Sequence, residues 1–331
     1  MIIGISGTLG SGKTEIARYL TQKGFEFIDY KRDTSITDRI NGLDLNEATL
    51  DINELTPQTV FESLGDLIDY VTMKWRTLFV MTDINSIHDI SLLAKRPFFL
   101  HISVDAPLNI RWNRYQKHYP DLDFVSFAEA SELQRFDKGT LLTEVISKAD
   151  VKIINTSSNI TELYSQLDEL NLLDETRLRP SWDSYFMRLA DLAALRSNCM
   201  KRRVGAVIAR DKRVIATGYN GTPRHMTNCN EGGCPRCNTG NGSGAGLSTC
   251  LCLHAEENAL LESGRDRIGT NATLYCNTCP CLTCSVKIVQ SGITEVVYSQ
   301  SYSMDDLSSS VLKEGGVILR QFVSPKDGVM I

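Results

Sequence analysis

Four residues in the second half of the chain have the types and spacing of a zinc site with a catalytic acid. His254 and Glu256 are separated by one residue, and Pro280-Cys281-Leu-Thr-Cys284 follows after a gap. One histidine and two cysteines supply three ligands and leave a fourth tetrahedral position open, as in catalytic zinc sites. Zinc lowers the pKa of a water in such a position to about 7. Glu256 is not expected to bind the metal. Its carboxylate is expected to take a proton from the water and pass it to the leaving group, so the pattern predicts metal-assisted hydrolysis.

The three zinc ligands are expected at the starts of two helices that follow strands. Residues 256–261 (EENALL) are predicted to form a helix with His254 in its first turn. Pro280 suits the first turn of a second helix, because its missing N–H would be unpaired there anyway. Strands are predicted over 272–276 (ATLYC) and 295–298 (EVVY), before and after that second helix. This succession predicts an α/β layer with its site at one edge of a sheet, where helix N-termini lower thiol pKa values.

The cysteines are confined to one part of the chain: all ten lie between Cys199 and Cys284. Clustered cysteines in a chain without a recognisable secretory signal indicate metal binding in a reducing compartment rather than a disulfide framework. The insert over 228–252 has little apolar content, so a second, closed zinc site is predicted to supply the order that its core cannot. The alternative is a flexible loop with free thiols, and the spacing leaves open which four cysteines bind. Cys276 is expected to be a buried thiol on a strand, and Cys279 to adjoin the catalytic site without being a ligand.

A second motif lies near the N-terminus, where Gly7-Thr-Leu-Gly-Ser-Gly12-Lys13-Thr14 matches the P-loop pattern G-x-x-x-x-G-K-[ST] between an apolar strand and a helix. In such a loop, backbone N–H groups cradle phosphates, the lysine reaches the terminal phosphates and the hydroxyl holds Mg²⁺. The motif predicts nucleotide binding through Gly7, Gly12, Lys13 and Thr14, with ATP as a ligand to be expected. It leaves open whether this domain also hydrolyses the nucleotide or transfers its phosphate.

Further elements of the first domain follow from apolar runs and helical patterns. The predicted strands and helices are strands over 2–6, 77–82, 97–104 and 151–155 and helices over 15–20 and 160–170. Asp83 directly follows one of these strands, and its carboxylate is predicted to lie on the Mg²⁺ side of the nucleotide site. Arg111, Arg114 and Lys117 share a helical pattern that resembles the lid of small P-loop kinases; a solvated basic helix face is the equal alternative.

Length and composition limit the classes of protein to consider. At 331 residues, 42% hydrophobic and 23% charged, the chain is expected to be a soluble protein of two domains. We assign a first domain to 1–173, a linker to 174–180 and a second domain to 181–331. No apolar run approaches the roughly 20 residues of a membrane helix, and no signal peptide is expected, so the predicted location is cytoplasmic or also nuclear. The net charge of −5 and the lack of a basic run argue against a nucleic-acid partner.

The second domain resembles the deoxycytidylate (dCMP) deaminases. The resemblance rests on 199–207 (CMKRRVGAV), 218–223 (GYNGTP), 254–259 (HAEENA) and the cysteines of 280–284, and it spans residues 181 to about 323. The H-x-E and P-C-x-x-C pattern alone is shared by zinc nucleobase deaminases in general. The GYNGTP element and the cysteine-rich insert are more specific. The P-loop domain in front is similar to the arrangement in the fungal members of the family.

The resemblance implies an α/β chain, with a P-loop kinase-like parallel sheet joined to a cytidine-deaminase-like α/β/α domain. It implies hydrolysis of dCMP to dUMP and ammonia, which supplies dUMP for dTMP synthesis. By the same resemblance, His254, Cys281 and Cys284 hold the catalytic zinc, Glu256 shuttles the proton and Asn220 binds the sugar of the substrate.

Family properties also imply a second zinc, regulation and assembly. The matching ligands of the second zinc are Cys199, Cys229, Cys234 and Cys250, although the additional thiols of Cys237 and Cys252 leave the choice open. Activation by dCTP with Mg²⁺, inhibition by dTTP and a homo-oligomer, commonly a hexamer, are further implications. Tyr219 and Gly221 are the residues expected near an effector.

Other functions are compatible with parts of the pattern. A tRNA adenosine deaminase or a nucleic-acid cytidine deaminase would share the zinc ligands but needs a surface for a polynucleotide. A cysteine-rich nucleic-acid-binding module would explain the insert but gives no role to Glu256. The P-loop alone would fit a small-molecule kinase fused to a zinc domain.

Overall fold

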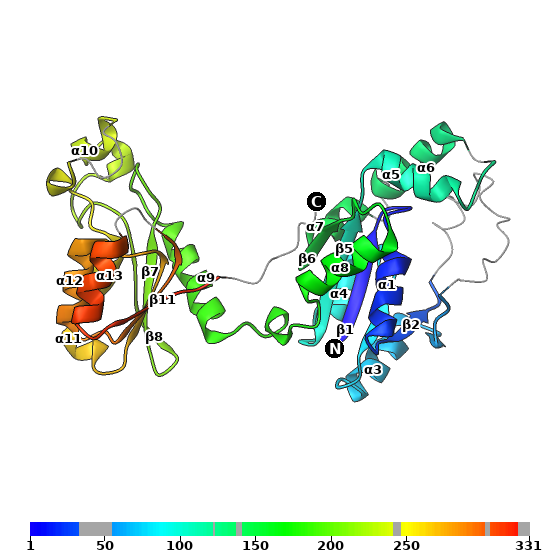
Figure 1. Cartoon of the computed structure of the whole chain (residues 1–331), viewed down its shortest axis with the longest axis horizontal. Coiled ribbons are helices and arrows are strands. Elements are labelled where there is room, and N and C mark those ends of the chain that lie inside the picture. The colour runs from blue at the N-terminus through cyan, green and yellow to red at the C-terminus, as the bar shows by residue number, and fades with distance from the viewer. Residues whose placement is uncertain (33–54, 122, 137–140, 241–245, 302–304, 324–331) are drawn as a thin grey trace. The chain divides into compact units, whose positions relative to one another are not determined.

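The computed structural model describes residues 1–32, 55–121, 123–136, 141–240, 246–301 and 305–323. The chain divides into two compact units, one containing Met1–Arg179 and the other beginning at Pro180 (Figure 1). The predicted linker, 174–180, includes a short 3-10 helix, Glu175–Arg177, at whose start Asp174 Oδ1 accepts from the N–H of Thr176. Among the described helices, none combines the length and the apolar character that crossing a membrane requires.

A parallel six-stranded sheet forms the centre of the first unit, in the order β3-β2-β4-β1-β5-β6. Every residue of β1 is buried, as expected for a strand that is covered on both faces. Its neighbours β4 and β5 lie on opposite sides, so the chain changes direction across the sheet at β1. The strands are β1 (Ile2–Gly7), β2 (Glu26–Tyr30), β3 (Thr59–Phe61), β4 (Phe79–Met81), β5 (Phe99–Asp105) and β6 (Val151–Ile154).

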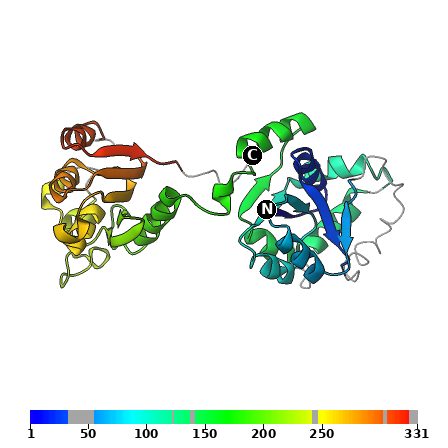
Figure 2. The same cartoon turned by 90° about the horizontal axis from the view of Figure 1, so that it is seen from below.

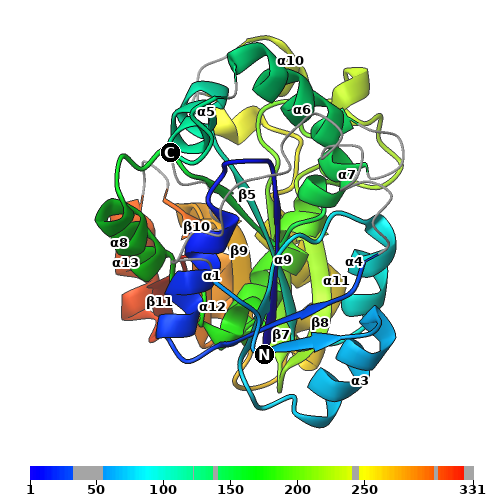
Figure 3. The same ribbon diagram turned by 90° about the vertical axis from the view of Figure 1, so that its right-hand side faces the viewer.

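Two hydrophobic layers hold helices against this sheet. Figure 3 shows α1 and α8 on one side of β1, and α3, α4 and α7 on the other. The two residue sets alternate along β4, where Val80 belongs to the first layer and Phe79 and Met81 to the second. The helices are α1 (Lys13–Gln22), α3 (Leu64–Met73), α4 (Ile87–Leu93), α5 (Leu108–Gln116), α6 (Phe124–Phe136), α7 (Leu142–Ser147) and α8 (Ile160–Leu170).

The second unit contains a mixed five-stranded sheet in the order β11-β10-β9-β7-β8. β9, β10 and β11 are parallel, whereas β7 is antiparallel to both β9 and β8. The strands predicted over 272–276 and 295–298 correspond to β9 and β10. The strands are β7 (Gly205–Arg210), β8 (Arg213–Tyr219), β9 (Thr273–Thr278), β10 (Glu295–Gln300) and β11 (Ile318–Gln321).

Helices cover both faces of this sheet as well. Figure 2 shows α9 on the side opposite α12 and α13. Helix α9 packs Phe186, Met187 and Ala190 on one face, while α11, α12 and α13 bury apolar residues against the other. The helices are α9 (Trp182–Ala194), α10 (Pro235–Asn238), α11 (Ala255–Ile268), α12 (Leu282–Ser291) and α13 (Asp305–Glu314).

An ion-pair network joins the first helix of the second unit to its last strand. Arg320 of β11 donates from Nη1 to Asp183 Oδ2 in the first turn of α9, over 2.7 Å, and from Nη2 to Glu295 Oε1 of β10, over 3.1 Å. The hydroxyl of Tyr275 also donates to Asp183, over 3.0 Å. The contact with Arg320 holds the pKa of Asp183 below its usual range. The network connects residues 137 positions apart in the sequence.

Candidate active site

The three predicted zinc ligands lie at the N-termini of two helices in the second unit. His254 is the N-cap residue of α11 and Cys281 that of α12, while Cys284 lies in the first turn of α12. His254 therefore directly precedes the helix in which it was predicted. Pro280 likewise comes one residue before the N-cap, rather than inside the first turn. Both helix starts thus differ from the predicted ones by only one or two residues, which is the usual uncertainty of helix boundaries.

The geometry of these three side chains fits a tetrahedral zinc. Cys281 Sγ and Cys284 Sγ lie 3.3 and 3.4 Å from His254 Nδ1, and the three ligand atoms are all within 4.8 Å of one another. Ideal zinc bonds of about 2.0–2.1 Å to nitrogen and 2.3 Å to sulfur would separate these atoms by about 3.6 Å. A donor set of one imidazole and two thiolates leaves one position of the tetrahedron for another ligand.

The ligands also polarise one another. The thiol of Cys284 is the main cause that lowers the pKa of Cys281 to about 3, and His254 adds to the effect. The hydrogen bond with Cys281 raises the pKa of His254 to about 9. The site thus favours a thiolate at the N-terminus of α12, the form of cysteine that binds metal.

Glu256 lies in the first turn of α11, is 4% exposed and does not belong to the three-ligand group. Burial raises the pKa of its carboxyl to about 7. A buried carboxyl beside a metal site, with a pKa near neutrality, can both accept and return a proton. This is the environment that the predicted proton shuttle requires.

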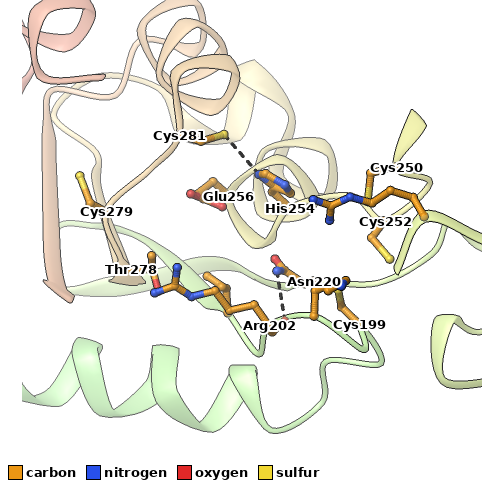
Figure 4. Close-up of a pocket in the computed structure, with 13 residues that line it drawn as sticks. Cys199, Arg202, Asn220, Cys250, Cys252, His254, Glu256, Thr278, Cys279 and Cys281 are labelled. Atoms are coloured by element: carbon orange, nitrogen blue, oxygen red, sulfur yellow. Dashed lines mark hydrogen bonds between the residues drawn. The ribbon is translucent and has the colours of Figure 1, made fainter. Parts of the chain in front are cut away.

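These groups open onto a cavity of about 200 Å³, shown in Figure 4. His254, Cys281 and Glu256 form one part of its lining, and Asn220 and Thr278 add uncharged polar groups. Three basic side chains also line it: Lys201, Arg202 and Arg236. The cavity therefore combines a metal site, a buried acid and positive charge, which suits a small anionic substrate.

Asn220 is held in place by the backbone at both ends of its amide. Its Oδ1 accepts from the N–H of Ala255 over 2.8 Å, and its Nδ2 donates to the carbonyl oxygen of Arg202 over 3.3 Å. These contacts fix the start of α11, and with it His254, relative to the loop before β7. Asn220 is 7% exposed and lines the cavity; its assignment to the sugar stays a prediction.

The GYNGTP element packs directly against α11. A Cβ at Gly218 would lie 2.1 Å from the carbonyl oxygen of Ala255, so only glycine permits this approach of strand and helix. Tyr219 accepts a hydrogen bond on its carbonyl oxygen from Asn258, over 3.1 Å. Gly221 pairs with Leu253, directly before His254. The element thus positions the zinc ligand, and the effector roles of Tyr219 and Gly221 stay predictions.

The cysteine-rich insert differs from its predicted arrangement. The four cysteines expected to bind a second zinc do not form one group among the described residues. Cys199 and Cys229 belong to one group of four, Cys234 and Cys250 to another, and both groups include Cys237 and Cys252. Residues 241–245 of the insert lie outside the described residues. Cys276 is fully buried on β9, and Cys279 is buried and lines the cavity without joining a ligand group.

In the first unit, the glycine-rich loop joins β1 to α1. Gly7 and Gly12 have φ angles of 154° and 103°, and Gly12 is the N-cap of α1. Lys13 Nζ donates to the carbonyl oxygens of Gly7 and Thr8 over 3.1 and 3.2 Å, and lies 3.4 Å from Asp83. Burial would raise the pKa of Asp83, but Lys13 holds it below its usual range. Thr14 is exposed at the start of α1.

The three basic residues for which a kinase lid and a solvated helix face were equal alternatives lie in different environments. Arg111 is 4% exposed and donates to the carbonyl oxygens of Leu9 and Ala106 over 3.3 and 2.9 Å. Arg114 donates to Ser11 in the same loop over 3.2 Å. Both arginines therefore support the backbone of the glycine-rich loop, whereas Lys117 is exposed at the end of α5.

Two residues of the cavity, Thr278 and Arg236, have no part in the sequence prediction. Thr278 lies two residues before Pro280, so its closeness to the zinc motif in the sequence could have indicated a place in the site. Arg236 belongs to the insert and reaches the cavity only through the folding of that segment. No local pattern marks it.

The comparisons with known proteins concern both units. Residues 180–300 match the family model described as the cytidine and deoxycytidylate deaminase zinc-binding region. A deoxycytidylate deaminase of Schizosaccharomyces pombe is 50% identical over 335 residues, which cover 99% of each chain. A deoxycytidylate deaminase of Saccharomyces cerevisiae is 51% identical over 288 residues, covering 82% of this chain and 91% of the yeast protein. A solved dCMP deaminase of cyanophage S-TIM5, in complex with dCMP and dUMP, covers 44% of this chain and 98% of its own at 31% identity, with a TM-score of 0.37.

Proposed function

This chain belongs to the deoxycytidylate deaminase family, and from this membership we propose that it hydrolyses dCMP to dUMP and ammonia. The identity of 50% over 99% of the Schizosaccharomyces pombe enzyme carries this conclusion. The geometry of the second unit agrees with it, because the zinc ligands and the buried carboxyl of Glu256 lie together beside a cavity that is also lined by basic side chains.

The zinc ligands and Glu256 have different roles in the reaction. When bound by His254, Cys281 and Cys284, zinc supplies Lewis-acid chemistry and lowers the pKa of water to about 7. Glu256 accepts the proton of the attacking water and delivers it to N3 of the cytosine ring. It then takes the proton of the hydroxyl that has been added to C4 and transfers it to the exocyclic amine, so that the C4=O bond forms, the C4–N bond breaks and ammonia leaves. One carboxyl, itself 4% exposed, thus performs each proton transfer.

We assign binding of the 5′-phosphate to the basic side of the cavity. Lys201 and Arg202 line it together with Glu256, and both belong to the loop that leads into β7. Phosphate recognition by such cations combines charge with hydrogen bonds. Arg224, in contrast, pairs with Glu262 over 3.0 Å at an exposed position. Reduced affinity for dCMP in a Lys201→Ala variant, with no matching loss for cytidine, would be the signature of this role.

We propose that the first unit is a P-loop nucleotide-binding domain of the kinase-like type. Its glycine-rich loop follows the central strand at which the strand order reverses, the place where open α/β sheets bind ligands. Lys13 and Asp83 lie 3.4 Å apart at this edge, which supports a site for phosphate and Mg²⁺. The boundaries 1–173, 174–180 and 181–331 form part of the same proposal.

Regulation and assembly are proposed on the strength of the family. We expect dCTP with Mg²⁺ to activate the enzyme, dTTP to inhibit it, and the chain to form a homo-oligomer, commonly a hexamer. Initial rates with each triphosphate and the mass measured by light scattering test these expectations separately.

The main test follows the absorbance of dCMP with the purified, zinc-loaded chain. We expect turnover of dCMP, and little of cytidine or of a cytosine-containing oligonucleotide, each with and without dCTP and Mg²⁺. Absence of dCMP turnover under all of these conditions would refute the proposed function. Preferential turnover of the oligonucleotide would instead favour a nucleic-acid deaminase.

A further inference from the structure

Six cysteines of the second unit converge in two groups of four that share two members. Within each group, the sulfur atoms all lie within 4.8 Å of one another. We propose that these cysteines bind two zinc ions, with the sulfur atoms of Cys237 and Cys252 bridging the two metals. The groups are Cys199, Cys229, Cys237 and Cys252, and Cys234, Cys237, Cys250 and Cys252.

The distances between sulfur atoms match those around tetrahedral zinc. Four thiolates at about 2.3 Å from one zinc ion lie about 3.8 Å from one another. Cys237 Sγ is 3.9 Å from Cys252 Sγ, 3.9 Å from Cys199 Sγ and 3.7 Å from Cys250 Sγ. Cys199 and Cys250 belong to different groups, so Cys237 contacts both. Disulfides require about 2.05 Å between sulfur atoms and are incompatible with these separations.

The number of cysteines favours two ions over one. A single tetrahedral zinc uses four of the six and leaves either Cys199 and Cys229 or Cys234 and Cys250 without metal. Two ions that shared no ligand would require eight donors, which the described part of this cluster does not contain. Sharing two sulfur atoms gives each ion four ligands and uses every cysteine of the cluster.

The surroundings of the sulfur atoms suit thiolates. Six thiolates and two zinc ions carry a net charge of about −2. Arg236, which is 8% exposed, directs Nη1 toward Cys237 Sγ at 4.0 Å, and buried charges of this kind are paired. The backbone N–H groups of Met200 and Leu251 donate to Cys229 and Cys234, each over 3.4 Å. One donor therefore serves an unshared ligand of each group, as hydrogen bonds do around metal-bound sulfur.

The cluster also accounts for the order of the segments that carry it. The buried core of this region consists of Cys229, Cys234, Cys237 and Cys252, with the partly buried Cys199 packed against it. Its described hydrophobic cluster contains cysteines alone, so hydrocarbon burial contributes little to its stability. Metal binding to thiolates supplies folding free energy directly in such small regions.

The cluster adjoins the catalytic cavity. Cys252 precedes His254 by two residues, and Cys199, Cys250 and Cys252 line the cavity together with Glu256. The two bound ions would therefore fix one wall of the site in which the proposed deamination takes place. The metal content itself does not depend on that function, so the two proposals can fail separately.

Native mass spectrometry of the full-length protein counts the bound ions. The wild-type chain should carry three zinc ions, and a His254→Ala variant, which loses a catalytic ligand, should carry two. Cys276→Ala is the matched control, because this buried thiol lies outside the two groups and the variant should keep three zinc ions.

X-ray absorption at the zinc edge then tests the bridging sulfur atoms. In His254→Ala, the spectrum should contain four sulfur neighbours per zinc and a zinc–zinc vector on the order of 3 Å, as follows from tetrahedra that share an edge. One zinc in this variant without a metal–metal vector would overturn the proposal, as would iron, copper or disulfides in place of zinc. If the variant does not fold, the wild-type count of three rather than two, with the same vector, decides the matter.

Discussion

Replacing Glu256 with glutamine is expected to lower kcat for dCMP by about 10⁴-fold while zinc stays bound. General acid–base catalysis contributes roughly 10² to 10⁴-fold, and the upper end applies where one carboxyl performs successive proton transfers. A loss of about 10⁴-fold corresponds to about 5.5 kcal/mol of activation free energy. Glu256 is 4% exposed, so bulk water has little access to replace it as a proton carrier. Because burial raises the pKa of this carboxyl to about 7, a neutral amide of the same shape removes little stabilising charge.

The assay combines dCMP turnover, zinc content and melting temperature for the variant and for Glu257→Gln. Glu257 is the adjacent acid on α11, but it pairs with Lys287 over 2.5 Å and is absent from the lining of the cavity. Surface pairs of this kind contribute about 0–1 kcal/mol, so the control should keep most of its activity and its melting temperature. Two results would refute the reasoning: zinc loss in Glu256→Gln, which would make the carboxylate a ligand, or activity above one tenth of the wild-type value.

Three further perturbations address other parts of the chain. Lys13→Ala should weaken ATP binding at least about tenfold in calorimetry, because a charged hydrogen bond to phosphate contributes roughly 1.5–3 kcal/mol; unchanged affinity would contradict the assignment of this loop. Burial lowers the pKa of His101 from 6.5 to about 4. The buried neutral imidazole therefore contributes fully to folding stability above about pH 6.5, and this contribution is lost as the pH falls toward 4. The full loss is about 3 kcal/mol, and the melting-temperature difference between His101→Phe and wild type should shift in favour of the variant on acidification. Gly218→Ala should lower the free energy of unfolding by about 1–3 kcal/mol, since its Cβ would lie 2.1 Å from a backbone oxygen of α11. Gly65→Ala is the control, because its Cβ would have only an ordinary contact at 3.5 Å and the change should be neutral or slightly stabilising.

The zinc ligands could be predicted because their chemistry is local in the sequence. His254 and Glu256 are two residues apart, and Cys281 and Cys284 share one turn of a helix, so the spacing already fixes most of the geometry. Apolar runs and caps act over similarly short distances, and helix α8 has the predicted bounds of 160–170. Its N-cap residue, Asn159, accepts from the N–H of Glu162 over 2.9 Å, the local signal typical of a helix start.

Interactions across long stretches of sequence were outside the reach of such patterns. The contact between Cys199 and Cys237 joins residues 38 positions apart, and it decides how the cysteines divide into groups. Spacing counts thiols but does not reveal which of them two groups share. Similarly, Arg114 and Ser11 are 103 positions apart, so the helical pattern could not show that this arginine supports the glycine-rich loop.

The network around Arg320 has a consequence for synthesis of the protein on the ribosome. Asp183, at the start of the second unit, meets its arginine partner only in the final strand, 137 positions later. While translation proceeds, Asp183 and Glu295 stay without this cation, and β10 presents an unpaired edge until β11 arrives. The second unit should consequently complete its fold only after Arg320 has left the exit tunnel. Nascent chains arrested before that residue should be cleaved by proteases within the second unit, and chains released after it should resist.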